Sequence, residues 1–376
     1  MDYRRFGRTN LELSTFSLGT MRCLRSPEVM YATLERAIEL GINHVETARS
    51  YGQSEVYLGR AFQSGIQRDR LYLTTKFLPR GSADEVEICI DQSLERLKTS
   101  YADMVAIHGV NTSEHLAWVL DESPTGGMAG IQRAIADGRI GHLGFSSHGS
   151  LEILTAAIDS DRFAFVNLHY NYFFQRNEPA IALAHQKDMG VFIISPADKG
   201  GKLYSPPDKL KHLCDPLTPL DWSYRFLLRD HRITTLSVGP ATPQELDPIA
   251  PANHQAAFTD EAQQILERLE QQGRSLPPGD RCSQCYACLP CPEAIPIPEI
   301  LRLRNLDRAY DMADYGKYRY GMLENAGHWF PGRRGDRCTE CGDCLPRCPE
   351  QLNIPALLQD AHNRFGDSFG RRLWED

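Results

Sequence analysis

Two runs of cysteine in the last quarter of the chain constrain its fold more than any other feature. The first run contains Cys282, Cys285, Cys288 and Cys291, followed by Pro292, and the second contains Cys338, Cys341, Cys344 and Cys348, followed by Pro349. Three thiolates spaced three residues apart can surround one face of a cubane cluster, while the cysteine before proline can reach a second cluster. The pattern predicts two 4Fe-4S clusters.

Zinc and disulfide bonds are the rival interpretations of these cysteines. A structural zinc site takes four ligands, usually from two CxxC pairs some distance apart, whereas each run here offers four cysteines within about eleven residues and ends in Cys-Pro. Disulfide frameworks belong to short secreted chains, and this chain has 376 residues and no recognisable signal peptide. Cluster ligation is therefore favoured, and zinc is the main alternative.

The spacing also predicts which cysteines share a cluster. The second run has the bacterial spacing CxxCxxCxxxCP, and the first run is one residue shorter before its last cysteine. By the cross-ligation rule of two-cluster ferredoxins, we expect one cluster on Cys282, Cys285 and Cys288 with Cys348, and the other on Cys338, Cys341 and Cys344 with Cys291. Residues 298–323 carry apolar side chains at helical spacing. We therefore expect a small, mainly α-helical ferredoxin-like iron–sulfur domain over residues 258–376.

Composition and charge exclude several classes of partner. The hydrophobic content of 41% suits one large and one small core. No window approaches the roughly 18 uninterrupted apolar residues of a membrane span. The net charge of -8 argues against a nucleic-acid partner, and we expect a cytoplasmic protein. Arginines of the cluster region, such as Arg302, Arg304, Arg333 and Arg334, are expected at a solvated surface, with the alternative that they guide a soluble one-electron carrier.

Upstream of the cysteines, short apolar runs alternate about eight times with amphipathic segments of helix length. The apolar runs suit buried parallel strands and lie at residues 15–18, 42–45, 71–75, 103–107, 140–145, 163–168, 191–194 and 234–238. Residues 27–40, 83–97 and 179–187 are examples of the helices between them. Eight such units in about 250 residues predict a (β/α)8 TIM barrel over residues 1–257.

Four polar residues close neighbouring strands of this predicted barrel, where chemistry is expected. Glu46 ends the second strand, Tyr51 follows it in the next loop, Lys76 ends the third strand and His108 ends the fourth. Each alone has an ordinary explanation: a loop carboxylate, a half-buried ring, a snorkelling lysine and a hydrogen-bonded core histidine. Together, on adjacent strand ends, they favour a catalytic site.

With these residues the chain resembles the aldo-keto reductase superfamily over nearly the whole barrel. The resemblance rests on residues 3–9 (YRRFGRT), 17–21 (SLGTM) and 41–52 (GINHVETARSYG), and on the lysine and histidine motifs at 74–76 and 103–108. With its cysteine runs, the chain resembles the subgroup that carries a two-cluster ferredoxin domain. The resemblance implies hydride transfer between NADP or NAD and a small-molecule carbonyl or quinone-like substrate.

The resemblance also implies a role for each of the four polar residues. Tyr51 would donate the proton, Lys76 and His108 would lower its pKa and steady the oxyanion, and Glu46 would orient Lys76. The family has aspartate where this chain has Glu46. The extra methylene moves the carboxylate by on the order of 1 Å, which makes the reductase activity an open question.

A nicotinamide site is implied at the same end of the barrel. The implied contacts are Gly19, Thr20, Met21, Ser146, Ser147, Asn167, Ser195, Pro196, Gly239 and Thr242, with Ser195, Pro196 and residues 199–203 in a loop over the pyrophosphate. Ile194 replaces an aromatic ring that many members stack on the nicotinamide. Ala241 replaces an arginine that many members direct at the 2'-phosphate, so the choice between NADP and NAD stays open.

Electron counting leaves the relation between the two predicted parts open. A nicotinamide transfers two electrons as hydride, whereas a cluster transfers one. The clusters would relay electrons, gate the barrel as a redox sensor, or act as structural staples. A different class of function also stays open: a nicotinamide-binding redox sensor or electron-transfer protein with little carbonyl reductase activity.

Overall fold

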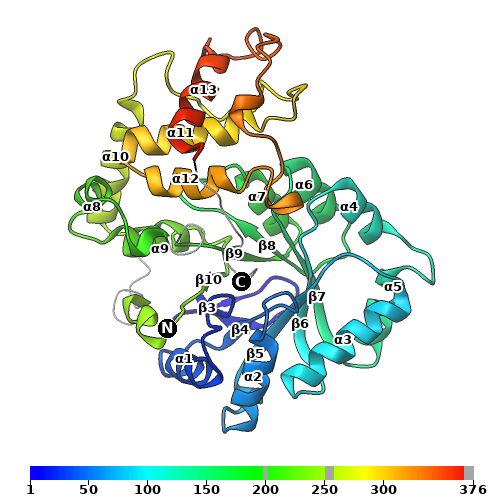
Figure 1. Ribbon diagram of the computed structural model, residues 1–376. Coiled ribbons are helices and arrows are strands. Elements are labelled where there is room, and N and C mark those ends of the chain that lie inside the picture. Colours follow the sequence, from blue (N-terminus) through cyan, green and yellow to red (C-terminus); the bar gives the residue numbers. More distant parts are fainter. Residues whose placement is uncertain (198–201, 250–257, 368–376) are drawn as a thin grey trace. The chain divides into compact units, whose positions relative to one another are not determined.

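A computed structural model describes residues 1–197, 202–249 and 258–367 (Figure 1). By its internal contacts the chain divides into two compact units. The first unit comprises the described residues within 1–201 and 223–257, and the second those within 202–222 and 258–375. Residues 202–222 thus group with the second unit, although they precede the boundary predicted at residue 258. That boundary itself adjoins residues outside the described ranges.

A closed barrel of eight parallel strands forms the first unit, so the predicted (β/α)8 fold is confirmed. Around the barrel the strands are β10 (Thr235–Val238), β3 (Phe16–Gly19), β4 (His44–Glu46), β5 (Tyr72–Phe77), β6 (Ala102–His108), β7 (Ile140–Ser147), β8 (Phe165–His169) and β9 (Gly190–Ile194). All eight runs predicted as strands overlap these elements. Because the strands are parallel, their carboxyl ends gather at one rim.

Helices surround the strands of the first unit (Figure 1). They are α1 (Pro27–Glu39), α2 (Ser54–Gln63), α3 (Ala83–Leu97), α4 (Ser113–Leu120), α5 (Gly127–Ala136), α6 (Leu151–Asp159), α7 (Glu178–Gln186), the 3-10 turns η1 (Arg68–Arg70) and η3 (Pro243–Ile249), and α9 (Pro219–Leu228), which begins in the second unit. Helix α3 has the predicted bounds because Ser82 and Glu85 form a capping box at its start.

An N-terminal hairpin, which the sequence analysis did not predict, closes the amino-terminal end of the barrel. It pairs β1 (Tyr3–Arg5) with β2 (Glu12–Ser14). Phe6 follows β1 and packs on Phe165, the first residue of β8, with ring centroids 5.2 Å apart. Gly7 has a φ of +52°, and an added Cβ there would lie 2.3 Å from the backbone nitrogen of Gly190. This plug leaves the carboxyl rim as the end available for chemistry.

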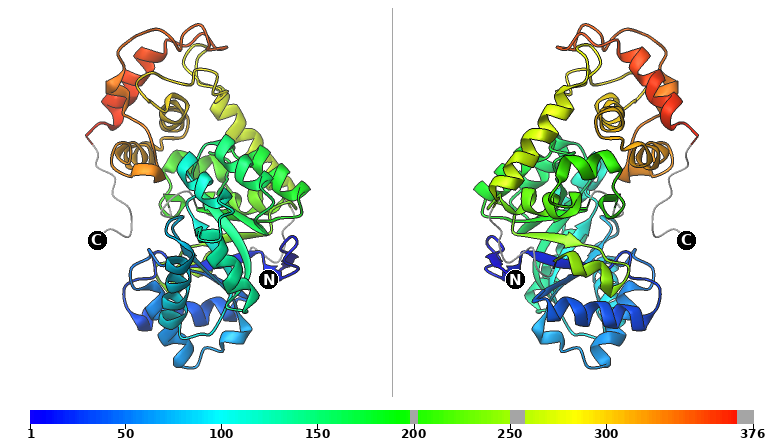
Figure 2. Two further views of the ribbon diagram at one scale, coloured as in Figure 1. Left: turned by 90° about the vertical axis from the view of Figure 1, so that its right-hand side faces the viewer. Right: turned by 90° about the vertical axis from the view of Figure 1, so that its left-hand side faces the viewer.

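The second unit is built of helices and connecting loops; Figure 2 draws its residues 202–222 in green and its residues 258–367 in yellow to red. Its elements are α8 (Asp208–Cys214), α10 (Asp260–Arg274), α11 (Ile297–Tyr310), α12 (Ala313–Gly321), α13 (Ile354–Phe365) and the 3-10 turns η2 (Lys202–Tyr204), η5 (Gly327–Trp329) and η6 (Gly335–Arg337). The mainly helical character predicted for it is confirmed. None of the described helices of the chain is long and apolar enough to cross a membrane.

The helical stretch expected at residues 298–323 is two helices rather than one. Helix α11 ends at Asp311, which adopts the left-handed conformation with a φ of +58°, and α12 starts two residues later. The break lets α11, α12 and α13 pack on one another around Ile300, Tyr320 and Phe365, all nearly fully buried.

Two arginines expected at a solvated surface are instead buried, so that prediction was wrong for them. Arg302 is 6% exposed and pairs with Glu299 at 2.6 Å, and Arg304 is 3% exposed and pairs with Asp280 and Asp360, each at 2.6 Å. The reason is that α11 is covered on most sides, and buried charges of this kind are paired.

Candidate active site and cysteine-lined cavities

Adjacent strands bring Glu46, Lys76 and His108 to the carboxyl rim of the barrel. Glu46 is the last residue of β4, Lys76 the penultimate residue of β5 and His108 the last residue of β6. Strand register places Glu46 beside Thr74 and Lys76 beside Ala106. All three side chains are buried, with 4%, 2% and 4% of their residue surfaces exposed. The rim therefore carries a buried acid, base and imidazole on consecutive strands.

Glu46 connects three strands through its carboxylate. Lys76 Nζ donates to Glu46 Oε2 and also to the backbone oxygen of Thr47, the latter at 2.9 Å. Ser237 on β10 donates to the other carboxylate oxygen at 2.7 Å. An added Cβ on Gly19 would lie 3.0 Å from Glu46 Oε1 and 2.6 Å from Ser237 Oγ, so glycine provides room for this contact. The longer acid thus still contacts Lys76.

Tyr51 and His108 lie against each other beside this pair. Their ring centroids are 5.6 Å apart at an interplanar angle of 82°, and Lys76 Nζ lies 5.1 Å from the centroid of the Tyr51 ring. Ser50, the residue before Tyr51, places its hydroxyl 3.1 Å from His108 Nδ1. The structure therefore brings all four polar residues predicted for the rim into one cluster.

Burial dominates the proton affinities in this cluster. It raises the pKa of the Tyr51 phenol and lowers the pKa of Lys76 to about 7. The direction for Tyr51 is opposite to the expected lowering by Lys76 and His108, because the ring is buried and no charged neighbour outweighs its desolvation. The phenol therefore stays protonated at neutral pH, and its raised pKa makes it a weaker acid, so proton donation would depend on neighbours that oppose the developing phenolate charge.

A second layer of polar side chains, which was not predicted, lies inside the barrel two residues before the rim on each strand. His44 Nδ1 lies 2.6 Å from Ser17 Oγ, His44 Nε2 lies 2.7 Å from Thr74 Oγ1, and Ser17 Oγ lies 2.7 Å from Thr235 Oγ1. Burial, with a smaller effect of the Lys76 charge, lowers the pKa of His44 to about 3, so the imidazole is neutral. Each residue stands two positions before a rim residue, the signal that could have revealed the layer.

The residues implied to hold a nicotinamide surround the same rim, but several already bind the chain itself. Ser147 donates to the Val110 oxygen at 2.7 Å, and Ser146 accepts from the Gly109 nitrogen at 3.0 Å. Thr20 donates to the Glu46 backbone oxygen at 3.0 Å. These hydroxyls therefore have structural roles within the barrel.

The remaining implied contacts lie at the ends of β3, β9 and β10. Met21 follows Gly19 and Thr20 after β3, and Ser195 follows β9 with a φ of +60°. The backbone oxygen of Pro196 accepts from the Ser223 hydroxyl at 2.9 Å, that of Gly239 accepts from the Arg22 guanidinium at 2.8 Å, and that of Thr242 accepts from the Glu245 backbone nitrogen at 3.2 Å. Residues 199–201 of the implied pyrophosphate loop lie outside the described residues.

Asn167 is the implied contact whose environment points most directly to a ligand. It lies in the middle of β8, in register with Ser146, and none of its surface is exposed. Neither its amide nitrogen nor its amide oxygen has a hydrogen-bond partner among the residues that the structure describes. A buried amide without partners costs roughly 1–3 kcal/mol, which a bound polar group would offset.

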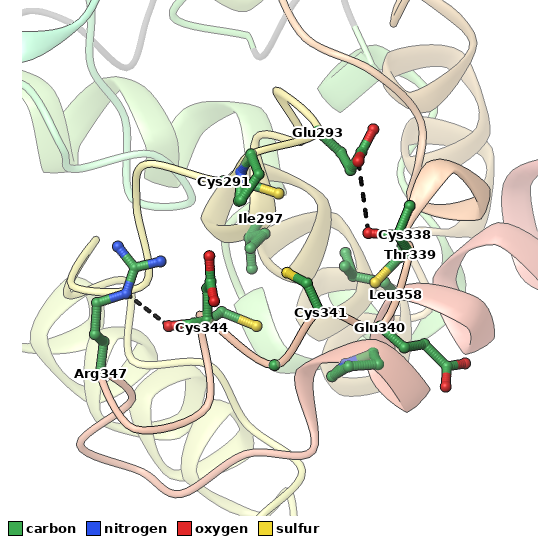
Figure 3. A pocket seen from close by; sticks show the side chains of 14 residues that line it. Cys291, Glu293, Ile297, Cys338, Thr339, Glu340, Cys341, Cys344, Arg347 and Leu358 are labelled. Carbon is green, nitrogen blue, oxygen red and sulfur yellow. Dashed lines mark hydrogen bonds between the residues drawn. The ribbon is translucent and has the colours of Figure 1, made fainter.

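The eight cysteines of the two runs line two cavities of the second unit. The first cavity is lined by Cys282, Cys285, Cys288 and Cys348, and the second by Cys291, Cys338, Cys341 and Cys344 (Figure 3). This grouping is the one that cross-ligation predicts. Apolar side chains complete both walls, including Leu301 and Ile354 in the first cavity and Ile297 and Leu358 in the second.

The arrangement of the cysteines in these two cavities suits a 4Fe-4S cluster better than a single metal ion. Within the described residues, no three His, Cys, Asp or Glu side chains converge closely enough to hold a single metal ion. Burial raises the pKa of the Cys288 thiol to about 12, so a thiolate there needs strong compensating positive charge such as ligated iron supplies. Four sulfurs around a common space provide the ligand set of a 4Fe-4S cluster.

Two family models match the chain. A model described as the aldo/keto reductase family matches residues 15–271, and one described as a 4Fe-4S dicluster domain matches residues 281–352. The second match places a 4Fe-4S dicluster domain over both cysteine runs.

Similar proteins and structures agree with the first match. A methylglyoxal reductase DkgB from Salmonella typhi is 36% identical over 100 residues, which are 26% of this chain and only 36% of that protein. An uncharacterized oxidoreductase YqkF from Bacillus subtilis is 26% identical over 222 residues, covering 56% of this chain and 69% of its own. The structure of the aldo-keto reductase AKR11C1 from Bacillus halodurans aligns with a TM-score of 0.62 at 21% identity, over 71% of this chain and 96% of its own.

Proposed function

The chain belongs to the aldo/keto reductase family, and on that premise we propose that it interconverts carbonyl compounds and alcohols by NADP- or NAD-linked hydride transfer, with two 4Fe-4S clusters in an electron-transfer domain. The contact cluster of Glu46, Lys76, Tyr51 and His108 at the barrel rim carries this proposal. An inert barrel would have no need to bury an ammonium, a carboxylate and an imidazole around a phenol.

The chain's own residues would supply the proton and stabilise the charge that develops on the substrate oxygen. Tyr51 is protonated at neutral pH, and it would donate that proton to the carbonyl oxygen. His108 would donate a hydrogen bond to the same oxygen, and Lys76 would oppose its negative charge. Glu46 and the Thr47 oxygen fix the position of Lys76 Nζ. The bound nicotinamide would supply the hydride.

Asn167 supports a nicotinamide site at this rim. Its buried carboxamide offers an NH2 donor group and an oxygen acceptor to a ligand, which is the pattern that another carboxamide satisfies. Gly19, Met21, Ser195, Pro196, Gly239 and Thr242 would line the rest of the nucleotide site. An anaerobic titration with both NADPH and NADH tests which of the two nucleotides the protein prefers.

The cluster domain would exchange single electrons with a soluble carrier. The first cavity would hold one cluster and the second cavity the other, each through four cysteine thiolates. The clusters could relay electrons, gate the barrel as a redox sensor or stabilise the fold. These three roles stay open because a hydride transfer moves two electrons, whereas a cluster transfers one at a time.

A second candidate is a nicotinamide-binding redox sensor or electron-transfer protein with little reductase activity. The hydroxyls of Ser146 and Ser147 favour the electron-transfer protein, because both are engaged with backbone groups and offer little to a nicotinamide carboxamide. Ile194, which has no aromatic ring to stack, favours it as well.

The substrate, partners and compartment are part of the proposal. A small aldehyde or ketone, or a quinone-like compound, suits the proton-donating site, and the methylglyoxal named for the DkgB relatives is a first compound to test. We propose a cytoplasmic protein without a nucleic-acid partner, in keeping with its net charge of -8.

An anaerobic titration tests the two candidates. Protein with intact clusters is mixed with NADPH or NADH, with and without methylglyoxal or a quinone, while nicotinamide absorbance and the paramagnetic cluster signals are followed. Nucleotide oxidation that requires the carbonyl compound supports the reductase. Nucleotide binding without turnover of any compound in a panel supports the sensor, and cluster reduction by the nucleotide alone supports the relay.

A further inference from the structure

The two cysteine cavities differ at one matched position. Gln284 precedes Cys285 in the first run, and Glu340 precedes Cys341 in the second. Both residues adopt the left-handed backbone conformation, with φ values of +62° and +55°. The same turn therefore carries a partly buried amide in one run and a solvent-exposed carboxylate in the other.

The amide of Gln284 donates to a cluster ligand. Its Nε2 lies 3.3 Å from Cys282 Sγ and 2.8 Å from the backbone oxygen of Pro298. A backbone oxygen only accepts hydrogen bonds, so the atom that faces Pro298 is the nitrogen, and this contact determines the orientation of the amide. The second N–H of that nitrogen is then available to the Cys282 sulfur.

The second cavity has more charged side chains in its lining than the first. Its lining includes the acidic residues Glu293, Glu340 and Asp343 and one cation, Arg347 (Figure 3). Arg347 is held by the backbone oxygens of Asp343 and Pro290, at 2.8 and 3.0 Å. Arg333 pairs with Glu293 at 2.9 Å, so Glu340 and Asp343 carry the remaining negative charge of this lining, which Arg347 partly offsets.

Only one charged residue lines the first cavity, the acid Glu350. Solvent exposure does not separate the cavities, because their cysteines match. Cys285 and Cys341 are both exposed, and Cys288 and Cys344 are both buried, at 6% and 8%. The hydrogen bond to sulfur and the charge at the matched position of Gln284 and Glu340 are therefore the two determinants of cluster potential that differ.

We propose that this chain separates the reduction potentials of its two clusters through Gln284 and Glu340, so that the cluster on Cys282, Cys285, Cys288 and Cys348 is reduced first. Reduction adds one electron and one negative charge to a cluster and breaks no bond. The Gln284 N–H stabilises that added charge, whereas the Glu340 carboxylate opposes it at the other site. An electron that a one-electron carrier delivers to the second cavity then passes downhill to the first. This inference rests on the two-cluster domain proposed above.

A redox titration with isosteric variants tests the proposal. Anaerobic protein is poised with mediators at a series of potentials, and the paramagnetic cluster signals are recorded for the unchanged chain, Gln284→Glu, Gln284→Leu and Glu340→Gln. We expect two separate one-electron transitions in the unchanged chain. Both Gln284 variants should move the higher transition to lower potential and leave the other in place. Glu340→Gln should move the lower transition upward.

Gln284→Leu removes the N–H donor without adding charge, so it separates the two causes. Iron content, about eight atoms per chain for two such clusters, is measured on every variant. Eight irons with coincident transitions in the unchanged chain, or a Gln284 variant that shifts only the lower transition or neither, would overturn the ordering alone. An unchanged chain that binds half that iron or less would overturn the two-cluster domain and the ordering together.

Discussion

Lys76 Nζ donates a hydrogen bond to Glu46 Oε2, and the two side chains are only 2% and 6% exposed. Glu46 Oε1 accepts from Ser237 on the far side of the carboxylate. Glu46 thus pairs with Lys76, although its side chain is one methylene longer than that of the aspartate expected at this position. The longer acid is accommodated because Gly19 leaves space beside it.

Glu46→Gln should destabilise the barrel and slow carbonyl reduction. The amide cannot neutralise Lys76, and breaking a buried ion pair by removing one partner costs about 3–5 kcal/mol. Thermal unfolding at pH 6, where Lys76 carries its charge, measures the loss. Ser237→Ala is the matched control, because it removes a neutral hydrogen bond to the same carboxylate and should cost about 1 kcal/mol. Equal losses of stability in the two variants would show that the ion pair stabilises the fold no more than the neutral hydrogen bond does.

Reduction should slow as the pH rises through about 7. Burial lowers the pKa of Lys76 to about 7, so its positive charge beside Tyr51 is lost above that pH, whereas burial keeps Tyr51 protonated. The profile of kcat against pH measures the effect. Lys76→Met should be slower and show no such fall, and a flat profile in the unchanged enzyme would contradict the assignment.

The same ionisation affects stability in the opposite sense. Lys76 has a pKa of about 7 in the native chain and an ordinary value of 10.5, so between these values the unfolded chain binds a proton that the native chain does not. The contribution of Lys76 to the free energy of unfolding should therefore rise with pH over this range. The difference in thermal midpoint between the unchanged chain and Lys76→Met, followed against pH, shows whether this contribution rises or falls.

Ser50→Ala should lower kcat up to about tenfold with little change in KM. The Ser50 hydroxyl lies 3.1 Å from His108 Nδ1, a contact that holds the imidazole in its orientation beside Tyr51. Loss of one hydrogen bond of about 0.5–1.5 kcal/mol sets that magnitude. Ser50→Thr keeps the hydroxyl and should restore the rate. A rise in KM alone would assign Ser50 to substrate binding instead.

Asn167→Leu should weaken nucleotide binding without destabilising the fold. The substitution removes a buried amide that has no partner in the described part of the chain, so the thermal midpoint should be unchanged or higher. Loss of its hydrogen bonds to a nicotinamide should raise Kd about 10- to 100-fold. Fluorescence titration with NADPH and NADH measures Kd. Unchanged affinity together with a lower midpoint would mean that Asn167 is structural.

Cys348→Ser should remove the cluster of the first cysteine run, although Cys348 belongs to the second run. Cys348 lines the first cavity with Cys282, Cys285 and Cys288, and Cys291 lines the second. About half of the iron should be lost. Cys291→Ser should lose the other half, with a different residual paramagnetic spectrum. If each variant instead lost the signal of its own run, ligation would not cross between runs.

The strand ends could be predicted from the sequence because buried parallel strands are short apolar runs that a polar residue closes. This pattern located Glu46, Lys76 and His108, and the capping residues Ser82 and Glu85 located the start of α3. The hairpin of β1 and β2 escaped prediction because its strands have only three residues each and no clear apolar alternation.

Other features depend on tertiary contacts that no local pattern contains. Asp311 ends α11 in a left-handed turn, although apolar spacing continues past it. The burial of Arg302 and Arg304 is set by the helices and carboxylates around them. The His44 layer follows from strand register, and the direction of the Tyr51 pKa follows from how deeply the ring is buried. Charge and spacing in the sequence do not determine these quantities.

The central claim is that Tyr51 donates the proton in carbonyl reduction. The most direct measurement compares NADPH and NADH oxidation by the unchanged protein and by Tyr51→Phe, with methylglyoxal and a panel of aldehydes and quinones, after titration shows equal nucleotide binding. General acid catalysis contributes typically 10²- to 10⁴-fold, so the account predicts a loss of at least about 100-fold in kcat. Carbonyl-dependent oxidation at an undiminished rate in Tyr51→Phe, with nucleotide affinity intact, would contradict it.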